Sequence, residues 1–202
     1  MVGFNEKAQQ LGFSRFSDIP EHLVYEEWDG VPILYNGVHS YAHDPQQLGQ
    51  LEMGSSVFQS LIVEYVLGML YAQVDRQRYA IFTNEAGLQL GYRSTLSNDI
   101  ALVERSRIAN KRSVKYSNIP PMVSIEVDVK ADYEADFDSF GDYIQQKTQK
   151  LIDFGVEKVI WILSTDQLEV RMTTATGTTR YAWDAQIEVM TGVVFCLGEM
   201  DA

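Results

Sequence analysis

The sequence predicts an α/β fold in which a mixed β-sheet is flanked by helices. The evidence is a hairpin turn signal at Asp29-Gly30, two long segments with helical spacing of apolar residues, and short apolar runs around them. The resulting order is strand hairpin, helix, strands, helix, strands, which brings parallel and antiparallel neighbours into one sheet. At 202 residues we expect one domain, 1–202, with its core over about 25–173.

The elements are justified in chain order by their turn and cap residues. A short helix over 5–11 precedes the hairpin, and a long loop over 36–54 follows it. Ser55 or Ser56 caps the first long helix, and Gly155 closes the second. The predicted helices span 55–74 and 136–154, and the predicted strands span 23–28, 31–35, 79–83, 88–92, 100–103, 122–129, 156–163, 168–173 and 178–183, with turns at 84–87 and 166–167.

Composition excludes several classes of function. The net charge of -12 argues against a chain that coats nucleic acid without specificity. No run approaches the ~20 apolar residues of a membrane span, and the N-terminus lacks the pattern of a signal peptide. The single cysteine, Cys196, has no partner for an internal disulfide or a zinc cluster. We therefore expect a cytoplasmic protein that does not enter a membrane.

Charged residues within core-forming segments carry the functional signal. Asp99 opens the aliphatic run 100–103, and Glu126 lies inside the apolar run 122–129. Such charges are costly unless they converge on a partner, and two carboxylates with an ammonium suggest a divalent metal and a phosphate. Two structural alternatives stay open: Asp99 is a turn residue after Asn98, or Glu126 and Asp128 line the solvent side of an edge strand.

Lys147 supplies the ammonium of this set. It falls in the middle of the apolar face of the second helix, whose core positions are Phe137, Phe140, Ile144, Leu151 and Phe154. A lysine there needs an anionic partner, or it extends its stem past the sheet edge to reach water.

A basic stretch lies between the two acids in the sequence. It contains Arg105, Arg107, Lys111, Arg112 and Lys115, five of the 16 lysines and arginines. Such a run is either a solvated loop or a surface that faces nucleic-acid phosphates.

Four segments resemble one known family. Residues 25–33, YEEWDGVPI, resemble its opening YELIDGVPI hairpin, and 98–103, NDIALV, resemble its PD-x-x-V-V strand. Residues 121–127, PMVSIEV, resemble P-x-L-V-I-E-V, and 147–161 resemble K-x-x-x-Y-x-x-x-G-V-x-E-Y-W. This is the Uma-two family of bacterial restriction-endonuclease-like proteins, long catalogued as a domain of unknown function. The resemblance covers about 25–173.

The resemblance implies a PD-(D/E)XK nuclease fold with an N-terminal hairpin extension and a Mg²⁺ or Mn²⁺ site. In that pattern Asp99 and Glu126 are the metal ligands, the Val127 carbonyl is a third, and Lys147 is the catalytic lysine, recruited from the helix. Asp128 stands where the usual lysine would be, so it either binds metal or repels phosphate. Glu64, on the first long helix, stands where some nucleases of this fold place an extra ligand. The family's serines after Glu126 are absent.

Two functions are therefore expected from the sequence. The first is a Mg²⁺-dependent endonuclease that cuts DNA, with residues 105–115 steering the DNA backbone. The second is a catalytically inactive nuclease-fold interaction or regulatory module, a homodimer in which the acids are structural.

Overall fold

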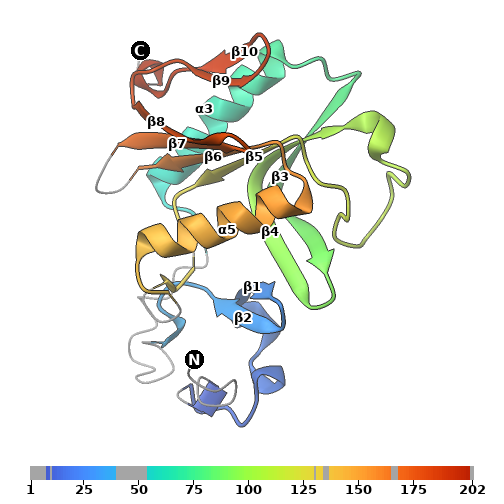
Figure 1. Cartoon of the computed structure of the whole chain (residues 1–202), viewed down its shortest axis with the longest axis vertical. Coiled ribbons are helices and arrows are strands. Elements are labelled where there is room, and N and C mark those ends of the chain that lie inside the picture. Colours follow the sequence, from blue (N-terminus) through green and yellow to red (C-terminus); the bar gives the residue numbers. More distant parts are fainter. Residues whose placement is uncertain are drawn as a thin grey trace. The chain divides into compact units, whose positions relative to one another are not determined.

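The computed structural model describes residues 8–9, 11–39, 54–129, 131–133, 137–164 and 168–200 (Figure 1). The chain forms two compact units. Unit 1 combines Met1–Gly54, Gln89–Ser97 and Lys130–Gln145, and unit 2 combines Ser55–Leu88, Asn98–Val129 and Gln146–Ala202. Strands β3 (Tyr79–Gly91) and β4 (Ser94–Glu104) and helix α5 (Phe140–Phe154) each contribute residues to both units.

The predicted hairpin is confirmed in unit 1. Strands β1 (Val24–Trp28) and β2 (Val31–Leu34) pair antiparallel. Asp29 and Gly30 between them have φ values of 52° and 89°, and a two-residue turn of type I′ requires positive φ at both positions. Glu27 pairs with Thr95, which adds the start of β4 to the hairpin.

Aromatic packing joins the hairpin of unit 1 to the start of α5. The Trp28 ring stacks on Tyr143 with centroids 5.5 Å apart, and Phe137 meets Trp28 edge-on at 5.2 Å. Buried Glu26 accepts hydrogen bonds from the Trp28 indole at 2.9 Å and from the backbone N–H of Ser97 at 3.1 Å. The Glu26 contacts fix the position of Ser97, which lies two residues before Asp99 on β4.

Unit 2 contains the mixed sheet that the sequence predicts. Its strands pair in the order β4-β5-β6-β7-β8, and β3 also pairs with β4. The pair β5·β6 is parallel, whereas β4·β5, β6·β7 and β7·β8 are antiparallel. The remaining strands of this sheet are β5 (Val123–Val127), β6 (Lys158–Leu163), β7 (Glu169–Thr174) and β8 (Gly177–Ala182).

Helix α3 (Val57–Gln73) covers one face of the unit 2 sheet. Ser56 and Gln59 form a reciprocal capping box at its start, as the predicted serine cap requires. Its buried residues Ile62, Val66 and Leu70 share a core cluster with the alternating strand residues Ile100, Leu102, Val123, Ile125, Val127, Ile160 and Ile162. On its other side α3 contacts a hairpin of β9 (Ile187–Met190) and β10 (Val193–Phe195), as Figure 1 shows.

Short 3₁₀ turns complete the described chain at Phe16–Asp18, Glu21–Leu23, Arg105–Arg107 and Leu197–Glu199. Among the described residues, no helix combines the length and apolar character that crossing a membrane requires.

Several element predictions were wrong in detail. A turn was predicted over 84–87, but β3 is one continuous strand in which Asn84 and Glu85 take φ values of 65° and 54°. The β9–β10 hairpin was not predicted. Strand β4 begins at Ser94 rather than 100, and α5 begins at Phe140 rather than 136. Most of the predicted helix over 5–11, most of the loop over 36–54, and the turn at 166–167 lie outside the described residues.

A partly buried phenol links α3 to the segment after β10, and its removal should weaken unit 2. The Tyr65 hydroxyl donates to the Cys196 carbonyl at 2.7 Å. Tyr65→Phe should lower the free energy of unfolding by about 1 kcal/mol at neutral pH, measured by chemical denaturation. Tyr92→Phe is the matched control, because Tyr92 is 93% exposed and should change nothing measurable.

The same phenol gives the pH dependence of that difference. Burial raises the pKa of Tyr65 above its usual 10.0. As pH rises past 10.0 the unfolded chain releases this proton first, so the phenol's contribution to stability falls until the raised folded pKa is passed. The wild type should therefore lose more stability above pH 10.0 than Tyr65→Phe. Parallel alkaline curves for the two proteins would contradict this.

Candidate functional site

Glu126 is built into the centre of the sheet of unit 2. All five residues of β5 are buried, and Ile125 and Val127 point into the core beneath α3. Because side chains alternate along a strand, Ser124 and Glu126 point to the opposite face. Neighbouring strands fix this position, since Ile125 pairs with Ile100 of β4 and Glu126 pairs with Trp161 of β6.

Lys147 of α5 is the ionic partner of Glu126. Its Nζ lies 3.0 Å from Glu126 Oε2, and the two side chains are 0% and 1% exposed. This confirms the predicted placement of Lys147 on the buried helix face. The ammonium also lies 5.6 Å from the centroid of the Trp161 ring, whose indole N–H donates to the Thr148 hydroxyl at 2.8 Å.

A buried ion pair of this kind is a poor source of stability. Removing each charge from water costs several kcal/mol, and a well-packed apolar pair of similar size often serves the fold as well or better. Charges that the core does not need for stability are a feature of functional sites.

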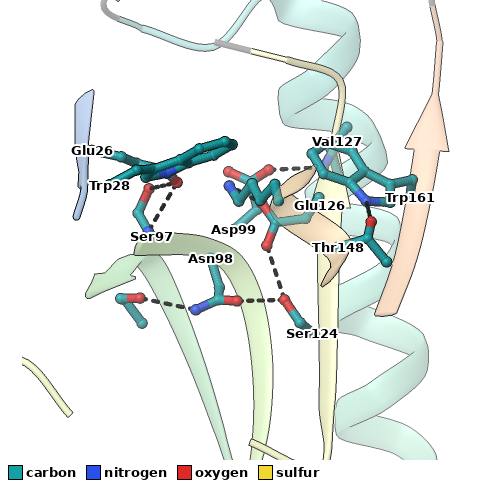
Figure 2. A network of polar contacts seen from close by, with 12 residues as sticks. Glu26, Trp28, Ser97, Asn98, Asp99, Ser124, Glu126, Val127, Thr148 and Trp161 are labelled. Carbon is teal, nitrogen blue, oxygen red and sulfur yellow. Dashed lines mark hydrogen bonds and ion pairs between the residues drawn. The ribbon is translucent and has the colours of Figure 1, made fainter. Parts of the chain in front are cut away.

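Asp99 joins the site from β4. It is partly buried, and the antiparallel pairing of β4 with β5 runs from Leu102 only as far as Ile100. Where the pairing stops, Asp99 Oδ2 accepts the backbone N–H of Val127 at 2.8 Å (Figure 2). Asp99 therefore lies inside β4, so its expected position at the start of a strand was wrong. Its carboxylate reaches the residue next to Glu126.

A series of polar side-chain contacts supports the Glu126 carboxylate, as Figure 2 shows. The Ser124 hydroxyl lies 2.9 Å from Glu126 Oε1 and also contacts Asn98 Oδ1, while the Asn98 amide donates to the Ala86 carbonyl at 3.2 Å. A hydroxyl carries one proton, so Ser124 can donate to only one of these two acceptors at a time. Asn98 and Ser124 are both buried, so these contacts lie in the interior of the protein.

Asp128 has a structural task at the end of β5. The alternation that would return it to the face of Glu126 ends at Val127, because Asp128 takes a left-handed φ of 55°. Its carboxylate accepts the backbone N–H of Ser164 at 2.6 Å and also the Ser164 hydroxyl. It thus caps the chain where β6 ends.

Glu64 is not brought to this site. It is exposed on α3, whose buried residues pack on the sheet face opposite Glu126.

The first two cations of the predicted basic stretch lie away from the acids. All five of its cations are exposed, and the stretch begins where β4 ends. Arg105 follows Asp99 by six residues, roughly 20 Å at ~3.3 Å per strand residue. Arg105 donates to the carbonyls of Arg76 and Tyr79, and Arg107 donates to that of Pro120, so both are tied to the far end of the sheet.

Several polar residues of the site were missed as members of one network. They are Asn98, which contacts Ser124; Thr148, which accepts from the Trp161 indole; Trp161, whose ring lies beside the Lys147 ammonium; and Ser164, which contacts Asp128. A signal existed for Thr148, which follows Lys147 on the predicted buried helix face. The pairing of Trp161 with Glu126 depends on strand register, which local sequence does not specify.

The donor set fits a hard divalent cation. Among the residues that the structure describes, no group of three or more His, Cys, Asp or Glu side chains could hold a metal ion. Mg²⁺ often needs fewer, since it binds through one or two carboxylates and completes its shell with water and substrate phosphate. Asp99 and Glu126 supply such oxygens, and with Lys147 the three formal charges sum to -1.

The α/β fold of this chain is shared with a protein of known structure. A crystal structure from Anabaena variabilis ATCC 29413, described as a "putative nuclease" of DUF820, is similar with a TM-score of 0.64, and the match covers 92% of this chain and 94% of that one. Sequence identity is 17%, so this similarity shows the fold alone. No family model matches the sequence, and no curated protein matches it.

Proposed function

We propose that this chain is a Uma-two-type, metal-dependent nuclease that hydrolyses phosphodiester bonds of DNA. The observation that carries the proposal is the fully buried contact of Lys147 Nζ with Glu126 Oε2 at 3.0 Å, on the strand whose Val127 N–H is held by Asp99. An acid on each of two adjacent strands can hold a metal that polarises a phosphate oxygen, and a lysine on the neighbouring helix can stabilise the charge that develops. The nuclease-like fold of the Anabaena protein agrees with this assignment.

Three oxygen donors from this chain would hold the cation. They are the carboxylates of Asp99 and Glu126 and the carbonyl of Val127. In an extended strand the N–H and C=O of one residue point toward the same neighbouring strand. The Val127 N–H reaches Asp99, so the Val127 carbonyl is directed to the same side. When bound, Mg²⁺ or Mn²⁺ supplies Lewis-acid polarisation of a phosphate oxygen and makes an attacking water more acidic.

Lys147 orients and stabilises charge in this proposal. Its ammonium fixes the Glu126 carboxylate, and the Trp161 ring and the surrounding core limit its movement. A fixed positive charge in a site with little water stabilises negative charge that develops on phosphate oxygens. Residues 105–115 would contact the DNA backbone, with Arg105 and Arg107 at a distance from the cut.

The proposal is tested by a cleavage assay with purified protein, linear and supercoiled DNA, and Mg²⁺ or Mn²⁺. Asp99→Asn should lower the cleavage rate by at least about 100-fold, because it removes a ligand charge while keeping an acceptor for the Val127 N–H. Glu27→Gln is a matched control, since Glu27 pairs with Arg93 in unit 1. The proposal fails if wild-type protein cuts no DNA with either metal, or if Asp99→Asn cuts equally well.

A second function is supported by the partners of Glu126. Its two oxygens contact Lys147 and Ser124, an arrangement that also suits an inactive nuclease-fold module in which the acids are structural. That module would act through protein contacts, as a homodimer. Calorimetric titration of Mg²⁺ and Mn²⁺ separates the two functions, because the inactive module should bind neither metal. In that case Asp99→Asn should also have the same association state as the wild type.

A further inference from the structure

A cleft of about 650 Å³ opens in unit 2 at the end of the sheet where β5 and β6 begin. Arg78 and Tyr79 line it at the start of β3, Met122 and Lys158 at the starts of β5 and β6, and Met190 and Val193 on the β9–β10 hairpin. The backbone N–H groups of Glu157 and Lys158 both donate to the Met122 carbonyl at 3.1 Å, which holds the two strand starts together.

Lys158 places a partly desolvated ammonium in this cleft. Its Nζ donates to the Glu188 carbonyl at 2.7 Å, and an ammonium has three N–H groups to donate. Burial lowers the pKa of Lys158 below its usual 10.5, although the Glu188 carboxylate acts in the opposite direction. An ammonium with a lowered pKa is incompletely compensated by its surroundings, so an anion beside it would be bound favourably.

Arg78 is the second cation of the cleft. Its guanidinium lies 5.1 Å from the centroid of the Tyr79 ring, which orients it, and its side chain is 64% exposed. Glu104 forms an exposed ion pair with it at 3.6 Å, and pairs of this kind are weak. Arg105 donates to the Tyr79 carbonyl at 3.1 Å and so adds positive charge behind this wall.

The cleft also has three acids in its lining beside its two cations, and two of these acids accept backbone N–H groups. Asp75 accepts the Gln77 N–H at 2.9 Å, and Glu188 accepts the Gly192 N–H at 3.4 Å; Glu157 is the third acid in the lining. The remaining wall is largely apolar and includes Met122, Val189 and Met190. A suitable ligand therefore joins a compact anion to a body with apolar faces.

We propose that this cleft binds the phosphate group of a nucleotide, with Arg78 and Lys158 on the phosphate oxygens and the methionine wall against the base. The anion site follows from the cleft alone, whereas the choice of a nucleotide rests on the proposed function. The nucleotide is either a free mononucleotide or the end of a DNA strand, and both present the same phosphate chemistry.

The cleft is separate from the acidic site. Val123, which lines the cleft, precedes Glu126 by three residues, about 10 Å along the strand. Val123 also belongs to the core under α3, whereas Glu126 faces the opposite side of the sheet. A phosphate held by Arg78 and Lys158 is therefore not the one that is cut, and the cleft anchors product or substrate at a distance.

Isothermal titration calorimetry without divalent metal tests this inference. The probes are inorganic phosphate, deoxyadenosine 5′-monophosphate and a 5′-phosphorylated single-stranded oligonucleotide. Arg78→Gln with Lys158→Gln should weaken binding by about tenfold or more, since each charge-assisted hydrogen bond is among the strong ones. Arg15→Gln with Arg180→Gln is the matched control: both residues are exposed and lie outside the cleft and outside the 105–115 stretch, and the charge change is equal.

The outcomes distinguish a free mononucleotide from the end of a DNA strand, and they test the cleft independently of the proposed nuclease function. Mononucleotide binding supports a free nucleotide, and binding of the oligonucleotide alone supports a strand end. Glu126→Gln should abolish cleavage and leave phosphate binding in the cleft unchanged. If the wild type binds phosphate but cuts no DNA, this inference is supported and the proposed function fails. Absence of binding at millimolar probe, or binding that the double variant leaves unchanged, overturns it.

A measurement on the wild type covers the case in which the double variant does not fold. The methyl NMR signals of Met122 and Met190 should shift on titration of the mononucleotide, because both side chains line the cleft. Shifts confined to other methionines would overturn the inference.

Discussion

Lys147→Met should destabilise the protein by about 3–5 kcal/mol, because it leaves the Glu126 carboxylate buried without its ammonium. The two side chains are 0% and 1% exposed, so water cannot replace the lost partner without opening the core. Methionine keeps the length and most of the volume of lysine, so the loss reports charge rather than a cavity. Chemical denaturation of purified variants measures it.

The double variant Lys147→Met/Glu126→Gln should recover part of that loss. Removing both charges leaves a neutral amide that Ser124 still contacts, and the coupling between two such neighbours is commonly 0.5–3 kcal/mol. Lys150→Met is the control, since Lys150 lies on the same helix but is only partly buried. A loss below about 1 kcal/mol in Lys147→Met, or a double variant no better than the single one, would show that the pair is not coupled as described.

Asp128→Ala should cost about 2–4 kcal/mol, the second large effect. It leaves the Ser164 N–H without its acceptor at the end of β6, and it places alanine at a φ of 55°. Asp128→Asn should retain most of the stability, because asparagine tolerates this backbone region and keeps an acceptor oxygen. Thermal and chemical unfolding of the two variants give the comparison.

The same pair of variants decides whether Asp128 is a metal ligand. If its task is to cap Ser164, Asp128→Asn should cut DNA at close to the wild-type rate and bind Mg²⁺ with similar affinity. Loss of metal affinity in Asp128→Asn, comparable to that of Asp99→Asn, would instead assign Asp128 to the metal site and show that the cap is secondary.

Local chemistry predicted the parts of the fold that depend on a few neighbouring residues. The Asp29-Gly30 turn, the Ser56 cap of α3 and the buried face of α5 all follow from backbone preference or periodicity. The same reasoning failed at Asn84 and Glu85. Both residues take the left-handed backbone that a turn would use, but pairing with β4 keeps them within one long strand.

The candidate site was predictable where charge conflicted with pattern. Asp99, Glu126 and Lys147 stood out because each is a charge at the start of, or within, an apolar segment. In the structure Lys147 pairs with Glu126, and Asp99 accepts the N–H of the next residue, Val127. Their polar neighbours did not stand out, because an ordinary serine, asparagine or threonine gives no such conflict. The position of Asp128 also required the structure, since its φ of 55° breaks the alternation on which the sequence argument relied.

The Glu126–Lys147 contact and the Tyr65 hydrogen bond differ in the number of residues that lie between their two partners. Glu126 and Lys147 are 21 residues apart, whereas the Tyr65 hydroxyl reaches a carbonyl 131 residues away. In an unfolded chain the longer loop costs ~1.6 kcal/mol more entropy to close. The Glu126–Lys147 pair can thus form from one short stretch of polypeptide early in folding, before the β9–β10 hairpin docks on α3.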